Sequence, residues 1–110
     1  MNNSLEDFIE KINNFDILSA SEKCDYFAYF VSEIDKNEEI KPKLIEDCFD
    51  VLRIPKYSNI SRYLQTNSKK SKNKPQKFIK NKNGYFIERF FKREIEDNIN
   101  KHLRKSNQVF

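Results

Sequence analysis

The segment that decides the fold is SNISRYLQTNSKKSKNKPQKFIKNKNGYFI, residues 58–87. Its first part predicts a short helix over residues 59–66, because the apolar residues there recur at the spacing of a single helix face. These inward-facing residues are Ile60, Tyr63 and Leu64. Ser58 is a favourable N-cap residue and is expected to begin this helix. Residues 67–77 contain five lysines and no apolar side chain, which predicts a mobile basic loop.

The last part of the segment predicts a β-hairpin. Two short β-prone runs, 78–79 and 85–87, flank a polar turn that contains Gly84, the one glycine of the chain. An Asn-Gly pair between such runs is a strong hairpin signal, because a type I′ turn needs a positive φ at both central residues. The register is ambiguous by one residue, and we expect Ile79 and Phe86 to face the core.

Three further helices are predicted before this segment and one after it. The upstream helices are expected at residues 4–12, 20–34 and 42–52, and the downstream helix at residues 89–103. Ser4 is the expected N-cap of the first helix. Ser19 and Glu22 form a capping-box pattern at the start of the second. We therefore expect one mainly α domain with one hairpin spanning residues 1–110, with a frayed tail at 104–110.

The periodicity of apolar residues also predicts the core. The expected core residues are Phe27, Ala28, Val31, Leu44, Ile45, Phe49, Leu52, Ile60, Leu64, Ile79, Phe86 and Phe91. Cys24 and Cys48 lie on apolar stripes and are interpreted as reduced core thiols, with a disulfide or redox pair as the alternative. The first and last helices carry apolar stripes outside this core, so we expect them either to mediate homodimer formation or to pack on each other.

Charge is distributed unevenly along the chain. Residues 1–52 hold five basic and thirteen acidic side chains, a formal net charge of −8. Residues 53–110 hold sixteen basic and four acidic side chains, a net charge of +12. Between Arg53 and Lys82 there are ten Lys or Arg and no Asp or Glu. A chain polarised in this way is expected to present one positive surface to a polyanion.

The order of the helices at 20–34, 42–52 and 59–66, followed by a basic hairpin, resembles the winged helix-turn-helix family. In that family two helices support a third, the recognition helix, and a β-hairpin wing follows. The resemblance covers residues 20–90 and implies such a domain with an extra N-terminal helix and a C-terminal helix. The chain departs from the pattern in the turn before the recognition helix, which carries Pro55 and no Gly, and in its longer loop before the wing.

The resemblance implies a nucleic-acid-binding protein that contacts duplex DNA, as a transcription regulator or as the DNA-recognition subunit of a larger system. Ser, Asn, Gln and Arg are residue types that hydrogen-bond base edges, whereas Lys on a loop or wing contacts phosphates. The expected nucleic-acid-binding residues are Arg53, Lys56, Ser58, Asn59, Ser61, Arg62, Gln65, Lys69, Lys70, Lys77, Lys80 and Lys82. Tyr57 and Tyr85 are candidates for stacking on single-stranded bases, with ordinary packing as the alternative.

A second hypothesis is an interaction module that uses the same fold to bind a partner protein and no nucleic acid. In that case the apolar side chains left over from the core would form the contact surface. These residues are Phe8, Ile9, Tyr26, Phe30, Phe90 and Phe110.

The sequence argues against catalysis, metals and cofactors. The acidic residues are spread along the helices, whereas a general acid–base pair needs carboxylates that converge in one pocket. His102 is the lone histidine and there is no Cys-x-x-Cys, so no metal site is expected. A single glycine excludes a Gly-rich phosphate loop. Because there is no apolar run of membrane-spanning length and no signal-peptide pattern, we expect a cytoplasmic protein without membrane contact.

Overall fold

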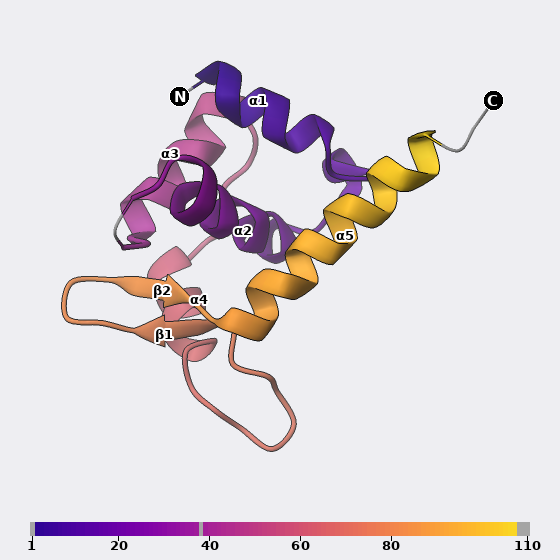
Figure 1. The fold of residues 1–110 in the computed structure, drawn as a ribbon. Coiled ribbons are helices and arrows are strands. Elements are labelled where there is room, and N and C mark those ends of the chain that lie inside the picture. The colour runs from indigo at the N-terminus through magenta and orange to yellow at the C-terminus, as the bar shows by residue number, and fades with distance from the viewer. Residues whose placement is uncertain (1, 38, 108–110) are drawn as a thin grey trace.

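The computed structural model describes residues 2–37 and 39–107, which Figure 1 shows as a ribbon. The elements are α1 (Asn2–Glu10), the 3-10 turn η1 (Phe15–Ile17), α2 (Ala20–Tyr29), the π-helical turn η2 (Phe30–Ile34), α3 (Pro42–Leu52), α4 (Ile60–Thr66), β1 (Phe78–Lys80), β2 (Tyr85–Ile87) and α5 (Arg89–Asn107). The prediction of a mainly helical fold with one hairpin is confirmed, and the arrangement is compatible with a winged-helix-like domain. Within the described part of the chain, no helix has the length and apolar character needed to cross a bilayer.

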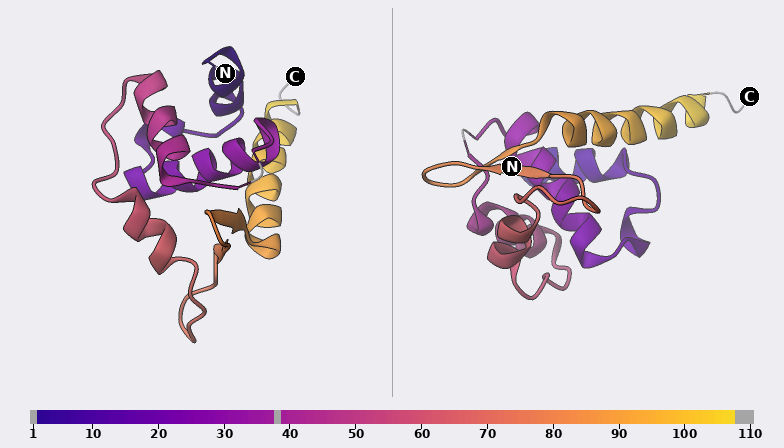
Figure 2. Two further views of the ribbon diagram at one scale, coloured as in Figure 1. Left: turned by 90° about the vertical axis from the view of Figure 1, so that its left-hand side faces the viewer. Right: turned by 90° about the horizontal axis from the view of Figure 1, so that it is seen from below.

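The centre of the core is α2, which lies between α3 on one side and α5 on the other in Figure 2. The Ser19 hydroxyl accepts from the Glu22 N–H at 3.2 Å and the Glu22 carboxylate accepts from the Ser19 N–H at 3.3 Å, so the predicted capping box is confirmed. Phe27 is fully buried, and its ring meets that of Phe49 edge to face with centroids 4.8 Å apart. Two large aromatic rings in this geometry join α2 to α3.

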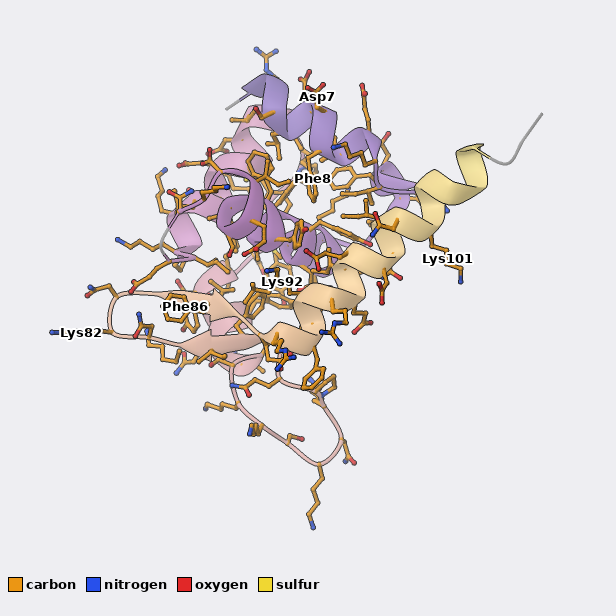
Figure 3. All side chains as sticks on the ribbon, in the orientation of Figure 1. Asp7, Phe8, Lys82, Phe86, Lys92 and Lys101 are labelled. Atoms are coloured by element: carbon orange, nitrogen blue, oxygen red, sulfur yellow. The ribbon has the colours of Figure 1, made fainter. Side chains whose placement is uncertain are left out.

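The apolar stripe of α1 packs within the chain. Leu5, Phe8 and Ile12 are all buried, and Phe8 points from α1 toward α2, as Figure 3 shows. The Phe8 ring stacks on Tyr29 with centroids 5.8 Å apart. The stripe that we expect to be free for self-association is therefore buried within the chain, against α2, η2 and α3. The helix also begins at Asn2, so Ser4 lies inside it and the predicted cap at Ser4 is wrong.

Apolar and polar contacts attach the long helix α5 to α2 and η2. Ile95 is buried, and the Tyr29 hydroxyl donates to the Glu96 carboxylate at 3.0 Å. Lys92 Nζ lies 2.8 Å from Glu33 Oε1. The helix continues to Asn107, beyond its predicted end, and residues 108–110 of the predicted tail lie outside the described residues.

The hairpin buries the face opposite to the expected one, which carries Ile79 and Phe86. Cross-strand pairs are Phe78–Ile87, Ile79–Phe86 and Lys80–Tyr85. Phe78 and Tyr85 are buried, whereas Ile79 and Phe86 are 43% and 42% exposed, so their predicted core positions are wrong. Both strands carry apolar residues on both faces, and tertiary contacts decide which face is buried. Ile40 fixes the position of Tyr85, because the two residues exchange backbone hydrogen bonds of 2.7 and 2.9 Å. Of the other predicted core residues, Leu44, Leu52 and Phe91 are partly buried against the core.

Gly84 allows the hairpin to lie close to the segment that contains Ile40. The predicted type I′ turn is wrong. Lys80 pairs with Tyr85, so the connection has four residues, and Gly84 does not have a positive φ. A Cβ atom at this position would lie 2.8 Å from the Ile40 carbonyl oxygen and 3.0 Å from Glu39 Cβ. The missing side chain therefore allows the hairpin to approach the Ile40 segment.

The turn from α3 into α4 has a left-handed residue where many helices have glycine. Arg53 has φ 56° and ψ 44°, and the following Ile54 N–H donates to the Phe49 carbonyl at 3.2 Å. This is the hydrogen bond of a Schellman cap, with Arg53 in the glycine position. At the start of α4, the Asn59 side chain accepts from the Arg62 N–H at 3.0 Å, so Asn59 is the N-cap and the prediction of Ser58 is wrong.

We predict that Phe49→Ala lowers the free energy of unfolding by about 3–5 kcal/mol, because it leaves a cavity beside Phe27. Phe86→Ala is the matched control, since it removes a phenyl ring that is 42% exposed. Chemical denaturation of both variants measures the difference. Equal losses would contradict the assignment of Phe86 to the outer face.

We also predict an acid-sensitive attachment of α5. Burial raises the pKa of Glu33, but hydrogen bonds from Lys92 and Ser32 outweigh it and hold the pKa below its ordinary value. The stabilisation is therefore present above the ordinary pKa of 4.5 and is lost as pH falls through the lowered pKa. Glu33→Gln should reduce the loss of stability on acidification, measured by thermal melts across pH. Glu10→Gln on α1 should leave that loss as in the unmodified chain.

Candidate nucleic-acid interface

The predicted base-reading residues lie together on the outer face of α4. Ile60, Tyr63 and Leu64 are buried, as predicted, and this fixes which side of the helix faces solvent. The exposed residues on and beside the helix are Ser58, Asn59, Ser61, Arg62 and Gln65. The side-chain oxygen Oδ1 of Asn59 accepts the hydrogen bond that caps the helix, so the side-chain NH2 group remains as a donor.

The basic part of the chain occupies one end of the molecule. Figure 1 shows α4, the loop 67–77 and the hairpin at the lower end, and α1 and α3 at the upper end. The loop 67–77 and the hairpin carry seven of the ten cations between Arg53 and Lys82, so these charges lie at the lower end. The helix α5, which also belongs to the basic half of the sequence, runs from this end toward the upper right. Such an arrangement produces a positive potential at one end of the molecule.

Eight of the ten cations between Arg53 and Lys82 have no carboxylate partner among the described residues. The two exceptions are Lys56 and Lys77. Lys56 Nζ lies 3.3 Å from Glu46 and 2.9 Å from Asp50, two exposed carboxylates of α3. Its hydrogen bond to Asp50 raises the pKa of Lys56. The charge of Lys56 is therefore partly offset, which makes it a weaker phosphate ligand than the sequence suggests.

Lys77 is partly buried, unlike the other predicted phosphate ligands, which are exposed. Its Nζ lies 2.9 Å from Asp25 Oδ2 and 3.1 Å from the Tyr63 hydroxyl, which donates to Asp25 Oδ1 at 2.5 Å. The ammonium group also lies 5.3 Å from the ring centroid of Phe91. We call Asp25, Tyr63 and Lys77 the polar triad. It joins α2, α4 and the residue before β1, so Lys77 positions the hairpin.

The buried position of the polar triad perturbs its ionisable groups. Burial raises the pKa of Asp25, while the Tyr63 hydrogen bond and the Lys77 charge act in the opposite direction. Burial, followed by the negative charge of Asp25, raises the pKa of Tyr63. The phenol therefore stays protonated and remains a donor to the carboxylate.

The loop 67–77 is closed at its base by backbone hydrogen bonds. The Asn67 carbonyl accepts from Lys77 N–H at 2.9 Å and from Phe78 N–H at 3.2 Å. The Gln76 side chain donates to the Ser68 carbonyl at 3.0 Å. The predicted ligands Lys69 and Lys70 lie in the exposed part of the loop beyond these contacts.

The hairpin carries its charge at and near the tip. Lys80 and Lys82 are exposed, and Figure 3 shows Lys82 pointing away from the turn. Lys80 Nζ lies 4.6 Å from the ring centroid of Tyr85. Tyr85 is buried, so it packs within the protein and its ring is not free to stack on a base. The turn is held by Asn81, whose amide donates to Glu39 Oε1 at 2.6 Å.

A polar groove lies between α4, the loop 67–77 and the first turn of α2, and we call it the α4 groove. Its volume is about 890 Å³. Tyr57, Arg62 and Lys74 line it, together with Ser21 from α2. The sequence places Lys74 among the ten cations that could contact phosphates, but nothing in it distinguishes Lys74 from the lysines beside it. The sequence also gives no sign of the positions of Ser21 and Asp25. Ser21 meets the other lining residues only in the folded chain, and the partners of Asp25, Tyr63 and Lys77, lie far away along the sequence.

Most of the residues predicted to contact a protein partner are buried or partly buried in the core. Phe8 and Phe30 are buried and Tyr26 is partly buried, so that prediction is wrong for the two phenylalanines. Ile9 is also partly buried, Phe90 is 68% exposed, and Phe110 lies outside the described residues.

The two cysteines are buried thiols, and the described residues contain no cluster of metal ligands. Cys24 and Cys48 are free and buried, as predicted for core thiols, and burial raises both pKa values to about 12. Thiols with such pKa values are protonated and unreactive at neutral pH. Among residues 2–37 and 39–107, no three His, Cys, Asp or Glu side chains converge as metal ligands.

Comparisons with protein-family models, with curated proteins and with solved structures give no match.

We predict that Asp25→Asn destabilises the fold by about 2–4 kcal/mol, because it leaves the Lys77 ammonium without its counter-charge in a largely buried site. Glu46→Gln removes an exposed partner of Lys43 and Lys56 and should cost about 0–1 kcal/mol. Urea denaturation compares the two variants. Similar losses for both would show that the polar triad does not hold the hairpin in place.

Proposed function

We propose that this protein binds nucleic acid, and duplex DNA in particular, as a regulator or as the DNA-recognition part of a larger system. In this proposal α4 enters the major groove and the hairpin contacts the flanking backbone. The observation that carries it is the coincidence of an exposed polar face on α4 with eight cations that have no carboxylate partner in the described chain. Polar groups supply base contacts and the cations supply phosphate contacts.

The division of roles among these residues follows from their positions. Ser61, Arg62 and Gln65 lie on the accessible face of α4, where an arginine can donate two hydrogen bonds to guanine and a glutamine can pair with adenine. Lys80 and Lys82 lie on the hairpin, and Lys69 and Lys70 on the loop, where they are suited to phosphates. Arg53 ends α3 and is exposed beside the start of α4.

The acidic helices would orient the protein on the nucleic acid. Repulsion from phosphates keeps α1 and α3 away from a polyanion, while the basic end is attracted to it. The charge of the whole chain is only +4, so orientation of the molecule matters more than its total charge.

We predict that Lys82→Gln weakens DNA binding for all sequences and makes the slope of log Kobs against log salt less negative by about 0.9. Lys101→Gln is the matched control, because it removes the same charge from α5, far from the hairpin in Figure 3. Fluorescence anisotropy with labelled duplex DNA at several salt concentrations measures both slopes. Equal changes would mean that only total charge matters.

We further predict that Arg62→Ala both weakens binding and relaxes sequence preference, by about 1–3 kcal/mol at the base it contacts. Competition between selected and random duplexes measures this preference. A uniform loss across sequences would assign Arg62 to a phosphate instead.

The second candidate is binding of a protein partner through the outer face of the hairpin. It is favoured by the Ile79–Phe86 cross-strand pair, two large apolar side chains that are both more than two-fifths exposed. Exposed apolar clusters often mark interaction sites. Absence of DNA binding at low salt would favour this candidate over the first.

A further inference from the structure

The α4 groove has the volume of a small-ligand site, and its walls are mainly polar. Its volume of about 890 Å³ lies within the usual range of about 300–1,000 Å³ for pockets that hold small molecules. Arg62 and Thr66 come from α4, Lys74 and Pro75 from the loop, and Ser21 from α2. A ligand in the groove would therefore contact three segments that are distant in sequence.

The lining of the groove is positive. Arg62, Lys74 and Lys77 contribute to it, and the lining contains no Asp or Glu. The Lys77 charge is offset by Asp25 beneath the groove. Arg62 and Lys74 have no carboxylate partner among the described residues, and both are exposed. One comes from each side of the groove, which suits an anion held between them.

The groove also has an aromatic wall. Tyr57 is partly buried and lines the groove, and its ring is held edge to face against Tyr63 at 5.3 Å. Tyr63 is itself fixed by its hydrogen bond to Asp25. A tyrosine that is held in this way is a pre-ordered surface for a nucleobase. Hydroxyl and amide groups from Ser21, Ser58 and Asn59 surround it as hydrogen-bonding groups for the ligand.

We propose that the α4 groove binds a single nucleoside phosphate, with the phosphate between Arg62 and Lys74 and the base against Tyr57. The ligand is a free mononucleotide or an unpaired nucleotide of a strand, and the two share this chemistry. For the strand, the inference rests on the nucleic-acid binding of the proposed function, and it names an unpaired nucleotide as the part that the groove receives. In that complex Arg62 holds a phosphate, whereas in the duplex complex it contacts a base. A stacked base pair presents no free base face, so the groove selects an unpaired nucleotide.

The test is an NMR titration of the full chain with three probes: adenosine 5′-monophosphate, a short single-stranded oligonucleotide and a blunt duplex. We expect the mononucleotide or the single strand to shift the backbone amides of Tyr57, Arg62 and Lys74 and to leave those of α1 unchanged. If only the single strand does so, the ligand is an unpaired nucleotide of a strand. Absence of shifts in the groove with both would overturn the inference.

Lys74→Gln and Lys72→Gln form the matched pair of variants. They remove the same charge from the same exposed loop, and only Lys74 lines the groove. Lys74→Gln should weaken mononucleotide or single-strand binding about tenfold, the effect of one charged hydrogen bond, and Lys72→Gln should have little effect. Equal weakening by both variants would overturn the inference, because it would mean that the loop lysines act only through their total positive charge.

The duplex probe separates this inference from the proposed function. Duplex binding at the hairpin and the outer face of α4, with equal effects of the two lysine variants on the other probes, would retain the function and reject the groove. Binding of the small probes that depends on Lys74, without any duplex binding, would retain the groove and reject duplex recognition.

Discussion

The placement of the basic end depends on one buried ionic contact, between Lys77 and Asp25. Lys77 immediately precedes β1, Asp25 lies in the middle of α2, and the Tyr63 hydroxyl of α4 completes the polar triad. A carboxylate that is only 9% exposed would be costly without these two donors. The same contact therefore compensates the burial of Asp25 and sets the hairpin and α4 against α2.

A second constraint acts from the opposite edge of the hairpin. Ile40 pairs with Tyr85 through two backbone hydrogen bonds, and Gly84 permits this approach because it has no Cβ. The hairpin is thus held by the polar triad before β1 and by the Ile40 segment at β2. With both attachments, the hairpin and α4 form a defined surface, as the proposed recognition of duplex DNA requires.

Local signals in the sequence predicted the helices well, and tertiary contacts explain what they missed. The capping box at Ser19 and the inward face of α4 depend on neighbouring residues, so both are readable from spacing. The buried face of the hairpin depends on Ile40, which lies 45 residues before Tyr85 in the sequence. Adjacent residues Ser58 and Asn59 are both good caps, and only the geometry selects Asn59.

The candidate site was predicted in its composition more than in its geometry. Arg62 and the exposed face of α4 follow from helical periodicity, whereas the α4 groove needs the contact of α4 with the loop and with Ser21. Lys77 was indistinguishable from its neighbours, because its partner Asp25 lies 52 residues earlier. A run of lysines carries no information on which of them is buried.

The pairing of some cations with carboxylates lowers the number of positive charges that are available to phosphates. Ten cations lie between Arg53 and Lys82, but Lys77 is committed to Asp25 and Lys56 to two carboxylates of α3. At most eight remain for phosphates, so counterion release from this segment is limited to a slope of about −7. Lys74 and Lys77 show the principle most clearly. They lie three residues apart in the same loop. Lys77 is held by Asp25, whereas Lys74 lines the groove without a carboxylate partner among the described residues, and we propose that it binds an anion there.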